Sequence, residues 1–97
     1  MTENILVSSL AMDLFRVAVG LNRKSFKMAA RFEEEALRRY KDLRDLGVSD
    51  DYLNQLLGKM KAALESGKKD REEDILVYSI LLQNYAVHRL DDLTSSV

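Results

Sequence analysis

The sequence predicts an all-α protein, a four-helix bundle with an up-and-down or orthogonal arrangement, and three observations support that fold class. The 97 residues include no proline and only four glycines, although hairpin turns depend on such residues. Apolar residues make up 46% of the chain and charged residues 32%, which is ordinary for a folded domain. The length suits one hydrophobic core. We therefore expect a single domain over residues 1–97, with helices at about 3–21, 25–46, 50–66 and 70–92.

The first predicted helix is apolar around more than half of its circumference, and Thr2 or Asn4 is placed to cap it. Its polar residues recur at spacings of four and three and therefore share one narrow stripe, which would be its solvated side in a monomer: Ser9, Asp13, Arg16, Gly20 and Arg23. Residues 5–21 carry two charges, and no basic region precedes them. Because a membrane span needs about 20 apolar residues, we expect a buried helix and no membrane association.

Residues 20–25 predict a break after the first helix, because Gly20 and Asn22 favour helix ends and Ser25 can cap the next helix. Without a proline, one continuous helix to about residue 46 stays open as an alternative, and a helix that long would need a partner chain to cover it.

The second predicted helix, residues 26–46, is amphipathic. Glu34 with Arg38 and Glu35 with Arg39 have the i, i+4 spacing of ion pairs on an exposed face. This pattern predicts a helix on the outside of the bundle.

The remaining helix boundaries are marked by residues that favour turns and caps. Gly47 can adopt the left-handed conformation that ends a helix, and Ser49 can cap the third helix, which ends near residues 66–67. Asp70 and Glu73 have the spacing of a capping box at the start of the fourth helix.

The fourth helix is apolar almost all round between residues 75 and 90, as the first helix is. We expect these two helices to be central. Since four short helices cannot easily enclose both, the apolar excess predicts a homodimer or a complex with a partner protein. The chain would then be an interaction or scaffolding module without catalytic chemistry or a cofactor, and the alternative is a monomer with narrow solvated stripes.

A basic segment over residues 16–31 supports a different hypothesis. It contains five cations and no acidic residue: Arg16, Arg23, Lys24, Lys27 and Arg31. These residues are candidates for binding nucleic acid or phosphate. The net charge of −1 gives no overall attraction to nucleic acid, so we do not favour this function.

A polar strip on the fourth helix supports a third and weaker hypothesis, a small metal-dependent hydrolase. Asn84, His88 and Asp91 follow one another at helical spacing, and a carboxylate could orient the imidazole. No nucleophile is paired with a base, no glycine-rich loop is present, and we assign no metal ligand. The absence of cysteine fits a reducing compartment, so we expect a cytoplasmic protein.

Overall fold

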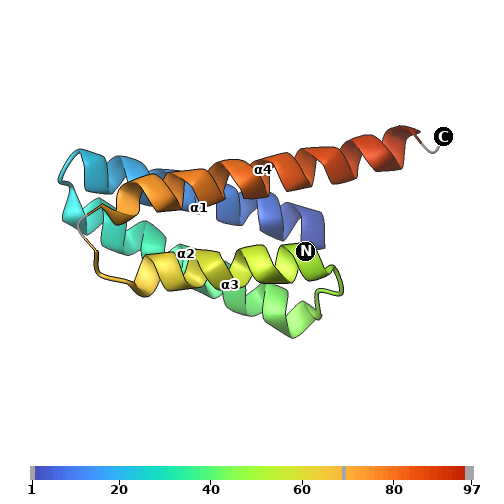
Figure 1. Cartoon of the computed structure of the whole chain (residues 1–97), viewed down its shortest axis with the longest axis horizontal. Coiled ribbons are helices and arrows are strands. Elements are labelled where there is room, and N and C mark those ends of the chain that lie inside the picture. The colour runs from blue at the N-terminus through green and yellow to red at the C-terminus, as the bar shows by residue number, and fades with distance from the viewer. Residues whose placement is uncertain (1, 69, 96–97) are drawn as a thin grey trace.

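The computed structural model describes the backbone of residues 2–68 and 70–95, and the side chains of these residues as far as residue 88. It contains α1 (Glu3–Asn22), α2 (Phe26–Leu46), α3 (Asp51–Glu65) and α4 (Arg71–Ser95). Each helix runs back along the one before it, so the bundle is up-and-down (Figure 1). The predicted four-helix bundle is confirmed, with α1 packed extensively against both α2 and α4.

Helix ends follow the local capping chemistry. The Thr2 hydroxyl accepts a hydrogen bond from the Ile5 amide at 3.3 Å, and Gly47 adopts the left-handed conformation with φ of 83°. The prediction of Ser49 as the cap of α3 is wrong, because the Asp50 carboxylate accepts from the Leu53 amide at 3.1 Å. A carboxylate in this position also interacts favourably with the positive end of the helix dipole.

The predicted break between α1 and α2 is confirmed, but the residues that make it differ from those expected. Lys24 takes the left-handed conformation with φ of 57°, and the Ser25 amide donates to the Gly20 carbonyl at 2.8 Å. This is the Schellman pattern that commonly ends helices. Ser25 makes no side-chain cap hydrogen bond. Gly20 lies inside α1 and is buried against Ala29 of α2.

The two ion pairs predicted within α2 are not the ones that form. Arg38 pairs with Glu35 at 3.2 Å, and Arg39 instead reaches α1, where its Nε donates to the Asp13 carboxylate at 2.8 Å. Burial raises the pKa of Asp13, and the hydrogen bond and charge of Arg39 oppose that rise. Asp13 is 4% exposed and is the one charged residue that is buried among those described.

The polar stripe of α1 is therefore solvated only in part: Arg16 and Arg23 are exposed, but Asp13 and Gly20 are buried. Asp13 and Gly20 face α2, where Arg39 neutralises the carboxylate and the glycine permits close helix packing. The apolar residues Ile5, Met12 and Phe15 are exposed instead. Among the residues described, α1 is the one helix that is both long enough and apolar enough to cross a membrane. Half of its most apolar segment is buried inside the bundle.

Candidate interaction surface

Helices α1 and α4 pack closely because small residues lie where they meet. The buried hydroxyl of Ser79 on α4 donates to the Ala11 carbonyl on α1 at 2.8 Å. This hydrogen bond places Ser79 level with Ala11 along the two helices. In the described part of α4, burial is confined to one stripe: Ile75, Ser79, Leu82 and Ala86.

The outward sides of α1 and α4 carry apolar side chains where a bundle normally has polar ones. Seven large apolar residues of these helices are between 37% and 51% exposed. Val77 is set apart by its position on α4, and we call the other six the α1/α4 face: Ile5, Met12, Phe15, Leu76, Ile80 and Val87. Their spacing of three, four or seven residues puts those of each helix on one side. Four of the six line one groove between the helices: Met12, Phe15, Leu76 and Ile80. An exposed apolar surface of this kind is typical of an interaction site.

Two hollows lie in the groove between α1 and α4, one on each side of Phe15. The first, the apolar hollow, has a floor of Ala11 and Ser79 and walls that include Met12 and Ile80. The polar residues that line it carry no charge: Ser79, Gln83 and Asn84.

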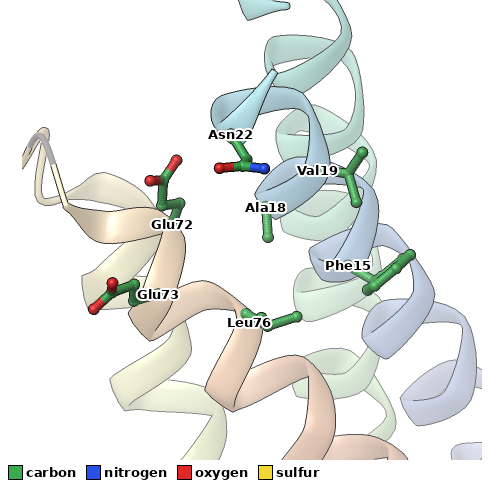
Figure 2. A pocket seen from close by; sticks show the side chains of 7 residues that line it. All are labelled: Phe15, Ala18, Val19, Asn22, Glu72, Glu73 and Leu76. Atoms are coloured by element: carbon green, nitrogen blue, oxygen red, sulfur yellow. The ribbon is translucent and has the colours of Figure 1, made fainter. Parts of the chain in front are cut away.

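The second, the acidic hollow, is lined on α1 by residues that include Ala18 and on α4 by Glu72, Glu73 and Leu76. Figure 2 shows Ala18 and Leu76 beside the gap between the helices, with Asn22 and Glu72 across from each other at one end. The groove is therefore apolar near its centre and becomes charged towards the start of α4.

The structure divides the basic residues of segment 16–31 into two groups. The guanidinium groups of Arg16 and Arg31 lie over the Phe32 ring, at 5.2 Å and 5.4 Å from its centre. Arg23, Lys24 and Lys27 are exposed around the turn between α1 and α2. Lys27 and Arg31 lie one turn apart on α2. The structure does not test the hypothesis of a nucleic-acid or phosphate site, which stays a prediction.

The polar strip on α4 is only partly described. Asn84 and His88 are exposed, and Asn84 lines the apolar hollow. Asp91 lies outside the residues whose side chains are described. Within the described part of the chain, no group of three or more histidine, cysteine, aspartate or glutamate side chains is placed to hold a metal ion.

Sequence reasoning noticed the apolar excess of the first and last helices but did not identify the face that carries it. The spacing of Ile5, Met12 and Phe15 was the available signal. It was ambiguous because nearly every position of this helix is apolar. No protein-family model, curated protein or solved structure matches this chain.

Proposed function

We propose that this chain is a small protein interaction module that self-associates as a homodimer through the α1/α4 face and carries out no catalysis of its own. The observation that carries the proposal is the exposure of six large apolar side chains on two closely packed helices. Burying this face against a second copy removes apolar surface from water, which stabilises the assembly.

The chemistry of the α1/α4 face also suits association of identical surfaces. A two-fold dimer brings the same residues of both copies together, so the face must complement itself. This face offers both a projecting ring, Phe15, and hollows beside it. The charged residues Glu72 and Glu73 lie at its end, so few charges would lose water when its centre is buried.

Replacing Phe15 by glutamate should weaken self-association at least tenfold, a change of about 1.4 kcal/mol, because a carboxylate would have to be buried at the centre of the interface. Phe15 is 46% exposed, so the monomer should still fold. Sedimentation equilibrium measures the change, with circular dichroism as the test of folding.

The matched control is Phe26→Glu, the same chemical change outside the α1/α4 face. Phe26 is 64% exposed at the start of α2, where an acidic residue is well tolerated. This variant should associate as the unmodified chain does. Equal weakening by both substitutions, or an unmodified chain that stays monomeric at high concentration, would contradict the proposal.

A further inference from the structure

We infer that a hollow at one end of the bundle binds a small organic phosphate, in which the phosphate group is joined to an aromatic group. The hollow lies where the turn between α1 and α2 meets the turn between α3 and α4, and we call it the end hollow. None of the six residues of the α1/α4 face lines it, so the inference does not depend on the proposed self-association.

Cations reach the end hollow from both turns. Lys24 lines it from the side of α1 and α2, and Lys68 and Arg71 line it from the side of α3 and α4. Within the described part of the chain, neither lysine has a carboxylate at ion-pair distance. Arg71 is held in place, because its guanidinium donates to the Leu64 carbonyl at 2.6 Å and lies 3.7 Å from the Glu33 carboxylate. A guanidinium carries several N–H groups, so Arg71 keeps donors for a ligand.

The backbone at Lys24 is strained, which supports a role for its side chain. Lys24 adopts the left-handed conformation with φ of 57°, which glycine and asparagine adopt more easily than lysine does. Together with Lys27 it also stands at the start of α2, which has no acidic residue in its first turn and no side-chain cap at Ser25. Because cations at this end oppose the helix dipole, a bound anion would stabilise the turn.

The walls of the end hollow favour a ligand that carries an apolar or aromatic part. Its volume is about 500 Å³, within the range of roughly 300–1,000 Å³ that is usual for small-molecule sites. Leu21 and Phe26 line it, and Phe26 is 64% exposed. An exposed ring can stack against a planar aromatic group of the ligand while the cations hold its phosphate.

The acidic start of α4 distinguishes a small phosphate from a long polyanion. Glu72 lines the end hollow, and Glu73 and Asp74 follow it in the first turn of the same helix. A single phosphate group can bind between Lys24 and Lys68. A nucleic-acid strand carries a charge at every phosphate and would bring further charges against these carboxylates. The charge distribution therefore favours a small ligand.

Isothermal titration calorimetry with adenosine monophosphate tests the inference, with adenosine and a single-stranded DNA oligonucleotide for comparison. We expect adenosine to bind at least about tenfold more weakly than adenosine monophosphate, because it lacks the charged group. Lys24→Asn and Lys68→Gln should each lower the affinity for adenosine monophosphate by about tenfold. Since asparagine accepts the left-handed conformation, Lys24→Asn should not lower the stability of the chain. The matched control is Lys41→Gln, on the exposed side of α2 away from the end hollow, which should bind as the unmodified chain does.

Two variants already proposed keep this inference separate from self-association. Phe26→Glu should lose adenosine monophosphate binding and still self-associate, whereas Phe15→Glu should bind adenosine monophosphate and associate weakly. No binding at millimolar ligand, equal affinity for adenosine, tighter binding of the oligonucleotide, or unchanged affinity in both lysine variants would each overturn the inference.

Discussion

Replacing Arg39 by methionine should lower the free energy of unfolding by about 3 kcal/mol at pH 7, because it leaves the buried Asp13 carboxylate without the cation that binds it. The Asp13 side chain is 5% exposed and accepts a hydrogen bond from Arg39 at 2.8 Å. Methionine keeps an apolar side chain at this position but donates no hydrogen bond. Arg16 is the other cation nearby, at 4.0 Å and 45% exposed, so it would replace Arg39 only in part. Urea denaturation measures the loss.

The loss should be smaller at pH 4 than at pH 7. Burial raises the pKa of Asp13 above its ordinary value of 3.8, and Arg39 opposes this rise, so removing Arg39 raises the pKa further. A carboxyl group with a raised pKa in the folded state contributes most to stability below its unfolded pKa, and this contribution is lost as the pH rises through the folded value. An equal loss at both pH values would contradict this explanation.

Two further variants separate the buried pair from a general effect of removing arginine. Arg38 is 62% exposed and pairs with Glu35 on the surface, so Arg38→Met should cost less than about 1 kcal/mol. The double variant Asp13→Leu, Arg39→Met should recover most of the stability lost by Arg39→Met. In that variant no carboxylate is left buried without its partner.

The helix ends were predictable to the extent that capping is local chemistry. Thr2 and Gly47 act as their sequence context predicts. The choice between Ser49 and Asp50 was not predictable, because both residue types cap helices well. The fold adds a contact to Asp50 that no local pattern contains, the hydroxyl of Tyr85 donating to its carboxylate at 3.2 Å.

The sequence predicted that the first and last helices carry excess apolar residues, but it did not predict which side of each helix faces solvent. Spacing showed that Asp13, Arg16 and Gly20 share a side of the first helix, but spacing does not show what that side meets. The partner of Asp13 is Arg39, 26 residues further along the chain. Once α2 covers Asp13 and Gly20, the apolar residues Met12 and Phe15 are turned outward, and this exchange is the physical origin of the proposed interface.

The close approach of α1 and α2 that buries Asp13 depends on Gly20, and Gly20→Ala should lower the free energy of unfolding by about 2 kcal/mol. A Cβ atom at position 20 would lie 2.9 Å from the Ala29 nitrogen and 3.1 Å from its Cα. Both atoms belong to the backbone, so no side chain can rotate away and α2 itself must move. That movement also strains the pairing of Asp13 with Arg39, since Arg39 lies on α2.

The same substitution at Gly58 should have the opposite sign, which separates the packing cost at Gly20 from helix propensity. Gly58 lies on the exposed side of α3, and a Cβ atom there would meet nothing within 4 Å. Alanine is favoured over glycine in a helix interior by roughly 0.5–1 kcal/mol, so Gly58→Ala should stabilise the chain by about that amount. Gly20→Ala receives the same gain and must still lose overall, because the backbone contact outweighs it. If both variants were stabilised in urea denaturation, the contact between α1 and α2 would not be as tight as the structure describes.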